Sequence, residues 1–336
     1  RLTVSLERWP ESERFAALTA ALAHERSQAN RPWRKLRRRK TLIPRATYRL
    51  QFNREFTFAR AAELVPYLAA LGVSHIYASP MLRARPGSLH GYDIIDHNRL
   101  NPEIGSEEEF QRLSDRLKEH GLGMMLDIVP NHMGVMGADN GWWLDLLENG
   151  RASNFSGFFD VDWNPVNAAL SDRVILPVLG DHYGRVLRNG EIRLAFDREA
   201  GSFSFGYYEH RFPVAPREYP QILRRALRNP PAELAQGVAA ELEALAASFG
   251  HLPPRSETDP ERLVERNRDK EVHKATLARL AREPRVAELI EQAVKELNGA
   301  PGDDASFDGL HALLEAQGYR LSYWRVASDE INYRRF

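Results

Sequence analysis

The sequence predicts an α/β fold built on a parallel sheet, and three observations support it. Strand-like segments alternate with amphipathic helical segments between Ile43 and Val129. The last of these strands is an apolar run that ends abruptly in Pro130, Asn131 and His132. A long region of different pattern follows His132. Strands that alternate with helices are typical of a parallel sheet with right-handed crossovers, and such sheets bind ligands where the strands end.

The elements can be assigned in order. Residues 46–52 alternate between polar and apolar and predict a strand, and residues 58–71 predict a helix that Gly72 ends. Residues 73–79 predict the second strand. Residues 106–120 predict a helix, because Ser106 and Glu109 have the spacing of a capping box. Residues 121–129 predict a third strand, which we expect to be buried because its centre is apolar.

The region after His132 has the pattern of an insertion. Residues 174–208 predict short antiparallel strands, with a tight hairpin turn at Asn189-Gly190. Residues 220–318 predict mostly helices, at 231–248, 260–282 and 285–297. We therefore expect three β/α units in residues 42–135, an inserted subdomain of strands and then helices in 136–318, and a return toward the first sheet in 319–336 that stops before a fourth strand.

Residues 1–41 differ from the rest. Residues 11–28 predict a helix, and Arg31–Lys40 contains seven basic residues among ten. Such a run fits either nucleic-acid contact or a solvated linker, and the linker is favoured because the run is short and contains one aromatic residue, Trp33. Leu6–Pro10 and the helix after it resemble the end of a bacterial 4-α-glucanotransferase, which suggests a fused or upstream protein.

Composition excludes several classes of function. The 46 basic and 46 acidic residues cancel, so no overall charge favours nucleic acid or a membrane surface. The chain contains no cysteine, which excludes disulfides and thiolate sites and suits a cytoplasmic protein. There is no apolar run of about 18 residues, so we expect no membrane partner.

Two polar clusters follow the second and third predicted strands. The first lies in residues 79–97, which include Tyr92 and Asp93, and the second is formed by Asn131 and His132. A metal site is one interpretation of the first cluster, but no HExxH-like spacing supports it. Sugar recognition fits better, because an aromatic ring can cover the apolar face of a sugar while carboxylate, amide and imidazole groups bind its hydroxyls. The metal interpretation would use His90, Asp93, Asp96 and His97.

Two motifs resemble, in order and spacing, the first signatures of the α-amylase superfamily of glycoside hydrolases and transglycosylases. They are Gly91–His97 and Asp127–His132. The resemblance extends from about residue 42 to the end of the chain and is most specific to one branch of the superfamily. Further stretches that carry it are residues 46–52, 140–150, 158–163, 175–184 and 319–336.

The resemblance implies that the chain holds strands 1 to 3 of a (β/α)8 TIM barrel, followed by a large insertion. It also implies a retaining intramolecular transglycosylation that converts the reducing-end α-1,4 bond of a maltooligosaccharide to an α,α-1,1 bond, a step of trehalose biosynthesis. The alternatives are an α-glucan hydrolase, a 4-α-glucanotransferase, or a non-catalytic glucan-binding fragment. No metal and no cofactor is expected.

Residue roles follow from the resemblance. Substrate contact is implied for Tyr92, Asp93 and His132 and more weakly for Gln51 and His97, with Asp127 and Asn131 in supporting roles. The nucleophile and the general acid of the family come from later strands, so we expect them after Phe336, in the remainder of the same polypeptide. Core packing is one interpretation of Trp142, Trp143 and Trp163, and sugar contact by at least one of them is the other.

Overall fold

The computed structural model describes residues 43–228, 236–327 and 330–334. The predicted helix at 11–28 and the basic run Arg31–Lys40 lie outside the described residues. The described chain divides into two compact units, which we treat separately. Unit 1 comprises the described residues up to Met81 with Leu89–Gly91 and Leu100–Ile128, and unit 2 comprises Leu82–Ser88, Tyr92–Arg99 and the described residues from Val129 on.

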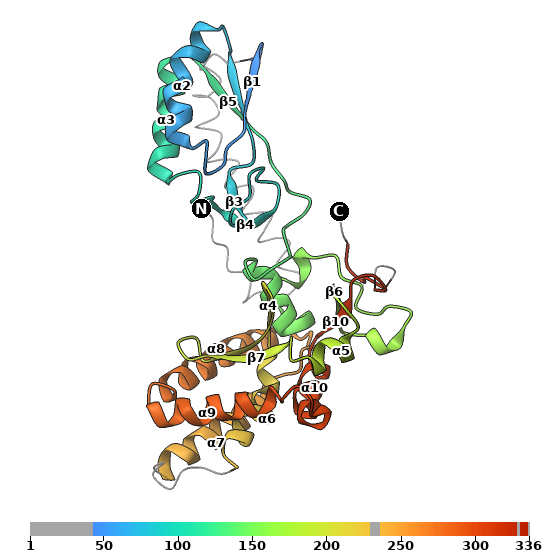
Figure 1. Ribbon diagram of the computed structural model, residues 1–336. Coiled ribbons are helices and arrows are strands. Elements are labelled where there is room, and N and C mark those ends of the chain that lie inside the picture. Colours follow the sequence, from blue (N-terminus) through green and yellow to red (C-terminus); the bar gives the residue numbers. More distant parts are fainter. Residues whose placement is uncertain (1–42, 229–235, 328–329, 335–336) are drawn as a thin grey trace, which may run out of the picture. The chain divides into compact units, whose positions relative to one another are not determined.

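Unit 1 is a three-stranded parallel sheet with two helices. The strands β1 (Thr47–Leu50), β2 (His75–Ala78) and β5 (Gly123–Leu126) lie in the order β1-β2-β5. Thr47 pairs with His75, which pairs with Gly123. The helices α2 (Phe58–Ala70) and α3 (Glu107–Glu119) lie side by side against this sheet (Figure 1). The predicted order of strand, helix, strand, helix and strand is therefore confirmed for unit 1, whereas the strands at Leu82–Ala84 and Ile94–Leu100, between β2 and α3, were not predicted.

Local signals set the ends of both helices. The Thr57 hydroxyl accepts from the Arg60 amide at the start of α2, and Gly72 follows the helix with φ of +84°. The Ser106 side chain accepts from the Glu109 amide, and the Glu109 carboxylate accepts from the Ser106 amide at 2.9 Å. This is the capping box that the sequence predicts.

The core of unit 1 lies between the sheet and its two helices. Ile76 and Ala78 of β2 are fully buried there, as are Phe58 of α2 and Leu113 of α3. The prediction that β5 is buried is wrong in its second half, because Met125 is 39% and Leu126 is 55% exposed. The strand is an edge of the sheet in the described part of the chain, so one of its sides has no neighbouring strand.

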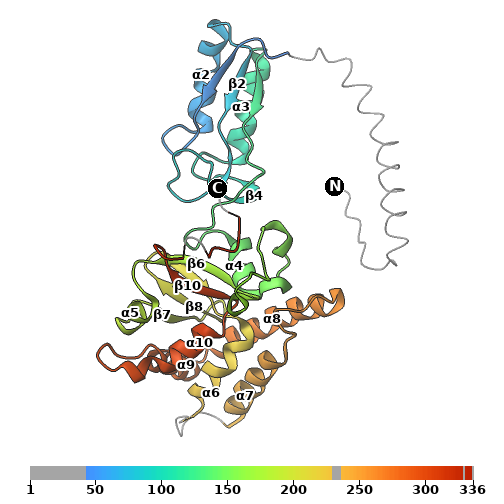
Figure 2. The same cartoon turned by 90° about the vertical axis from the view of Figure 1, so that its right-hand side faces the viewer.

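The described part of unit 2 contains three small sheets. Strands β3 (Leu82–Ala84) and β4 (Ile94–Leu100, whose last residue belongs to unit 1) form one. Strands β7 (Arg193–Asp197), β8 (Ser202–Tyr207) and β9 (His210–Pro213) form an antiparallel meander. Strands β6 (Val174–Leu179) and β10 (Tyr319–Tyr323) pair in parallel, although residues 180–318 separate them (Figure 2).

The prediction for residues 174–208 is therefore wrong in two respects. The strand β6 pairs in parallel with a distant partner instead of forming a hairpin. Asn189 and Gly190 end the short helix α5 (Tyr183–Arg188), with Gly190 at φ of +68°, and do not form a hairpin turn. An Asn-Gly pair supplies positive φ equally well to a helix end and to a hairpin turn, so the dipeptide alone cannot distinguish the two.

Unit 2 also contains helices, which were predicted for residues 220–318. Their apolar sides bury into one large core together with β6, β8 and β10, in which Phe203, Phe205 and Phe249 are fully buried. The helices are α4 (Gly141–Asn149), α6 (Tyr219–Ala226), α7 (Gln236–His251), α8 (Pro260–Leu280), α9 (Pro284–Leu297) and α10 (Asp308–Glu315).

Candidate saccharide-binding site

The two polar clusters that the sequence singles out meet in unit 2. The His132 Nε2 lies 3.1 Å from the Tyr92 carbonyl oxygen, and because that oxygen can only accept, the imidazole donates. Tyr92 remains 37% exposed, and Asn131, which directly precedes His132 in the sequence, is also exposed. The hydrogen bond therefore brings the segment that carries the Tyr92 ring close to the segment that carries the Asn131 amide and the His132 imidazole.

The loop that carries Tyr92 is held by hydrogen bonds around Asp93. The Ser88 hydroxyl donates to the Asp93 carboxylate at 2.5 Å, and the Arg85 amide donates to the Asp93 carbonyl oxygen at 3.1 Å. The Gly134 amide donates to the carbonyl oxygen of Ile94 at 2.8 Å. A Cβ at Gly134 would lie 3.0 Å from the Asp93 carbonyl oxygen, which is tighter than most such contacts, so glycine suits the close approach of the two segments.

Aromatic side chains lie beyond this pair of segments. The His97 ring centroid is 6.3 Å from that of Trp142, and the Trp142 ring stacks on Phe155 at 5.1 Å and packs against Phe158. Phe158 is 64% exposed and Trp142 is half-buried. These rings form an apolar surface open to solvent, to which a sugar face could pack.

The other two candidate tryptophans differ from Trp142. Trp143 is 3% exposed and packs against Phe159 and Tyr333 in the core, so it is not a sugar contact. Trp163 is half-buried, with the Arg151 guanidinium 5.8 Å from its ring. Successive residues of a helix face directions about 100° apart, and α4 turns Trp143 inward.

The first turn of α4 is fixed by Asn140. The Asn140 side-chain oxygen accepts from the Trp143 amide at 3.0 Å, and its amide nitrogen donates to the Gly134 carbonyl oxygen at 2.9 Å. One buried side chain therefore caps the helix that carries Trp142 and binds the segment that follows His132.

A buried charge cluster holds α4 against α8. The Lys270 ammonium is 4% exposed and lies 3.2 Å from Asp145 and 3.4 Å from Glu148. Lys274 lies 2.5 Å from Glu148, and Arg266 donates to Asn149 at 3.2 Å. Burial lowers the pKa of Arg266 to about 10, and the charge of Glu148 only partly offsets this. The cluster supports the helix that carries Trp142, and its centre at Lys270 and Glu148 is buried.

Two further predicted residues lie in unit 1. The Gln51 amide nitrogen donates to the carbonyl oxygens of Leu89 and His90, both at 3.1 Å. The Asp127 carboxylate accepts from Arg49 at 2.8 Å, and the same guanidinium lies 4.4 Å from the Tyr77 ring centroid. Both side chains therefore make hydrogen bonds to other residues of unit 1.

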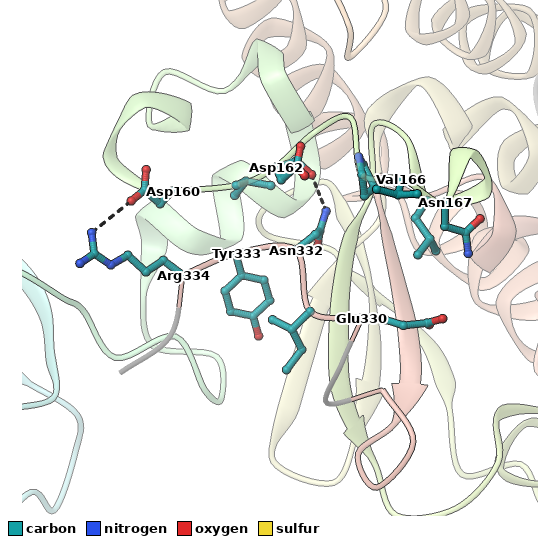
Figure 3. A pocket seen from close by; sticks show the side chains of 12 residues that line it. Asp160, Asp162, Val166, Asn167, Glu330, Asn332, Tyr333 and Arg334 are labelled. Carbon is teal, nitrogen blue, oxygen red and sulfur yellow. Dashed lines mark hydrogen bonds and ion pairs between the residues drawn. The ribbon is translucent and has the colours of Figure 1, made fainter.

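A cavity of about 690 Å3 was not predicted from the sequence (Figure 3). The segment Glu330–Arg334 forms one of its walls and lies along residues 160–162. Asn332 joins the two, because its amide nitrogen donates to the Asp162 carbonyl oxygen at 2.8 Å while its side-chain oxygen accepts from the Ile175 amide. The charged and aromatic run near residue 330 was visible in the sequence, but its partner segment was not.

Two negative findings apply to the part of the chain that the structure describes. No helix there is long and apolar enough to cross a membrane. No group of three or more histidine, aspartate or glutamate side chains within residues 43–228, 236–327 and 330–334 is arranged to hold a metal ion.

Part of this chain is similar to a known family of catalytic domains. The family model described as the catalytic domain of alpha amylase matches residues 61–163. A Mycobacterium tuberculosis (strain CDC 1551 / Oshkosh) protein assigned as a maltooligosyl trehalose synthase is 43% identical over 164 residues, which are 44% of this chain and 21% of that protein.

Solved structures extend the similarity over most of the chain. The maltooligosyltrehalose synthase of Arthrobacter ramosus is 29% identical with a TM-score of 0.52, and the match covers 87% of this chain and 26% of that one. A hypothetical maltooligosyl trehalose synthase of Sulfolobus tokodaii is 26% identical with a TM-score of 0.51, covering 88% and 26%. The chain thus spans about a fifth to a quarter of the length of these relatives. The chain is therefore similar to alpha-amylase catalytic domains over residues 61–163 and to maltooligosyltrehalose synthases over most of its length.

Proposed function

We propose that this chain is the N-terminal portion of an enzyme that forms maltooligosyltrehalose by intramolecular transglycosylation. The observation that carries the proposal is the meeting of the Gly91–His97 and Asp127–His132 motifs through the bond between His132 and Tyr92. The similarity to maltooligosyltrehalose synthases along most of the chain supports it. In this proposal β1, β2 and β5 are the first strands of a (β/α)8 barrel, and the protein is cytoplasmic.

The proposed roles follow from the chemistry of each group. The exposed Tyr92 ring stacks on the reacting sugar, and His132 and Asp93 bind its hydroxyls. His97 and Gln51 are further contacts, Asn131 and Asp127 support them, and Trp142 and Trp163 are the aromatic candidates that remain. The substrate is a maltooligosaccharide or α-1,4-glucan, and the partner is the remainder of the same polypeptide.

The reaction needs two carboxyl groups that we place after Phe336. One carboxylate attacks the anomeric carbon of the penultimate glucose, and a carboxylic acid protonates the glycosidic oxygen as the terminal glucose leaves. The released glucose must stay bound and turn, so that its anomeric hydroxyl attacks the glycosyl-enzyme and forms the α,α-1,1 bond. Exclusion of water by a closed pocket favours this attack over hydrolysis.

Product analysis on maltopentaose tests the reaction. The polypeptide that contains this chain together with the expected carboxylates should convert maltopentaose to a non-reducing product of unchanged mass, as measured by a reducing-end assay and mass spectrometry. Shorter reducing sugars would instead identify a hydrolase, and a mixture of longer and shorter sugars a 4-α-glucanotransferase. Binding without turnover by that polypeptide would identify a glucan-binding protein without catalysis.

Substitution of Tyr92 tests the proposed site. Tyr92→Ala should weaken maltopentaose binding about tenfold in calorimetry, because a stacking ring is lost. Tyr92→Phe keeps the ring and should retain most of the affinity. The matched control is Tyr67→Ala, which removes a tyrosine that is 59% exposed on α2. Equal affinities of Tyr92→Ala and Tyr67→Ala would contradict the role of Tyr92.

A further inference from the structure

A second cavity in unit 2, of about 450 Å3, is lined by aromatic and polar side chains that the proposed function does not use. It lies along β10, where Tyr319 to Tyr323 all line it, and extends to His182 and Tyr183 at the start of α5. Its volume is in the range of small-ligand sites, about 300–1,000 Å3. The cavity is therefore large enough to hold a small ligand.

The cavity reaches the carboxyl end of the parallel pair β6–β10. His182 and Tyr183 closely follow β6, which ends at Leu179, and Tyr323 is the last residue of β10. In parallel α/β sheets ligands bind in the crevice outside the carboxyl ends of the strands. Loops converge there, and their side chains can vary because they are not needed for the core. The topology thus places His182, Tyr183 and Tyr323 where a ligand is expected.

Aromatic rings are exposed to this cavity. The His182 and Tyr323 ring centroids are 5.1 Å apart, and the Tyr183 and His311 ring centroids are 5.7 Å apart. The Tyr183 hydroxyl lies 2.9 Å from the His311 Nδ1, and burial raises the pKa of Tyr183, so that the hydroxyl stays neutral. Rings with a neutral polar tip offer both an apolar face and hydrogen bonds.

The charges at the cavity are largely paired with each other. The Glu315 carboxylate lies 2.6 Å from Arg320 and 3.4 Å from Arg173. Burial alone would raise the pKa of Glu315, but the hydrogen bonds and charges of these two guanidinium groups outweigh it and lower the pKa. A carboxylate already shared by two arginines favours neither a phosphate nor a metal cation, and it presents a polar rim to a neutral ligand.

From position, rings and paired charges, we propose that this cavity binds glucose units of an α-1,4-glucan. The choice of α-1,4-glucan among neutral polyhydroxyl ligands rests on the proposed function. Tyr323 and His182 cover the apolar face of a sugar, while the Tyr183 hydroxyl, His311 and the Glu315–Arg320 pair bind its hydroxyls. A site of this kind would hold a stretch of the glucan chain through residues other than Tyr92 and His132.

Hydrogen exchange followed by mass spectrometry locates binding along the full chain. With maltotriose we expect slower exchange in peptides covering 180–188 and 319–327, and cellotriose, which differs in its linkage, should protect them less. Unchanged exchange in both peptides at saturating maltotriose would overturn the proposal. Equal protection by inorganic phosphate would also overturn it, because the site would then be an anion site.

Substitutions give the matched comparison. Tyr323→Ala should raise the maltotriose concentration for half-protection of residues 180–188 about tenfold, and Tyr323→Phe should leave it near the wild-type value. Tyr67→Ala is the control for loss of an exposed tyrosine elsewhere. If Tyr323→Ala fails to fold by circular dichroism, His182→Ala makes the same test, since His182 is exposed. An unchanged half-protection concentration in the folded variant contradicts the proposal.

The same data separate this inference from the proposed function. Protection of 180–188 and 319–327 without protection of 90–97 and 131–134 would support the cavity and contradict the Tyr92–His132 site. The reverse pattern would support the Tyr92–His132 site and overturn the cavity.

Discussion

We expect His210 to make the stability of unit 2 depend on pH. It lies buried in β9, its Nδ1 accepts from the Gly137 amide at 3.4 Å, and its ring stacks near Phe212. Burial lowers its pKa, with a smaller contribution from Arg85, while Glu209 opposes the shift. Protonation would put a hydrogen on Nδ1 and remove the acceptor that Gly137 uses.

The sign of the pH effect follows from linkage. The folded-state pKa of His210 is below its unfolded value of 6.5, so the unfolded chain binds more protons near that pH. The free energy of unfolding of unit 2 should therefore fall as the pH decreases from about 7 through the folded-state pKa. Thermal unfolding of wild type and His210→Gln across this range measures it, and the variant should lose part of the pH dependence.

The control for His210 is His251→Gln, which replaces an exposed histidine at the end of α7. It should keep the pH dependence of the wild type. If the stability of His210→Gln depends on pH in the same way as that of the wild type and of His251→Gln, His210 does not cause the pH dependence.

The roles of single residues were predictable where they depend on neighbours in the sequence. The Ser106–Glu109 capping box and Gly72 at the end of α2 are set by neighbours within four positions, and both predictions are confirmed. The separation of Trp142 from Trp143 was not predictable, because it depends on which side of α4 meets Phe159 and Tyr333. Residues far along the chain determine that contact.

At the scale of elements, α4 and α8 are joined by ionic contacts whose central residues, Lys270 and Glu148, are buried. Lys270→Met would leave Glu148, itself 8% exposed, with less compensation for its buried charge. We expect a loss of about 3 kcal/mol in the free energy of unfolding, the low end for breaking a buried pair, because Lys274 still contacts Glu148. Chemical denaturation measures this loss.

The exposed pair on α3 is the matched control. Lys118 lies 2.8 Å from Asp115, and both side chains are more than half exposed. Lys118→Met should change stability by less than about 0.5 kcal/mol, because water replaces the pair at little cost. Similar losses for Lys118→Met and Lys270→Met would contradict the distinction drawn from burial.

Helices were predicted well because their apolar residues recur at a regular spacing. Strand pairing was predicted poorly, because it depends on which two strands lie side by side. The helices of residues 220–318 follow the apolar spacing of the sequence, and the described part agrees. The apolar residues of β6 predict a strand, but they do not show that its partner is the distant strand β10. Periodicity fixes which residues face the core and carries no information about which strand lies alongside.

At the scale of the whole molecule, the described chain has two main apolar cores that share no residue. Phe58 is fully buried in the core of unit 1 and Phe249 in that of unit 2. The core of unit 1 is the smaller, so we expect unit 1 to be the less stable. The sequence predicted the sheet of unit 1, but the separation of cores depends on contacts such as β6–β10 that periodicity does not encode.

Core truncations test whether the units unfold separately. Phe58→Ala should destabilise unit 1 by about 3–5 kcal/mol through the cavity it leaves, and Phe249→Ala should do the same to unit 2. Calorimetry should show two transitions, of which each variant lowers a different one. A single transition lowered equally by both variants would show that the two cores unfold as one.

The pairing of β6 with β10 has a consequence for biosynthesis. At about 5–20 residues per second, the ribosome needs roughly 7–28 s to make the intervening residues 180–318, and β6 waits that long for its partner. The Val174 amide donates to the carbonyl oxygen of Gly318, which directly precedes β10, whereas the Ile175 amide donates to the Asn332 side chain. Successive backbone nitrogens of a strand point to opposite sides, so the nitrogen of Pro177 points away from β10. Because proline has no hydrogen to donate, that flank of the waiting strand is a poor template for a neighbouring nascent chain.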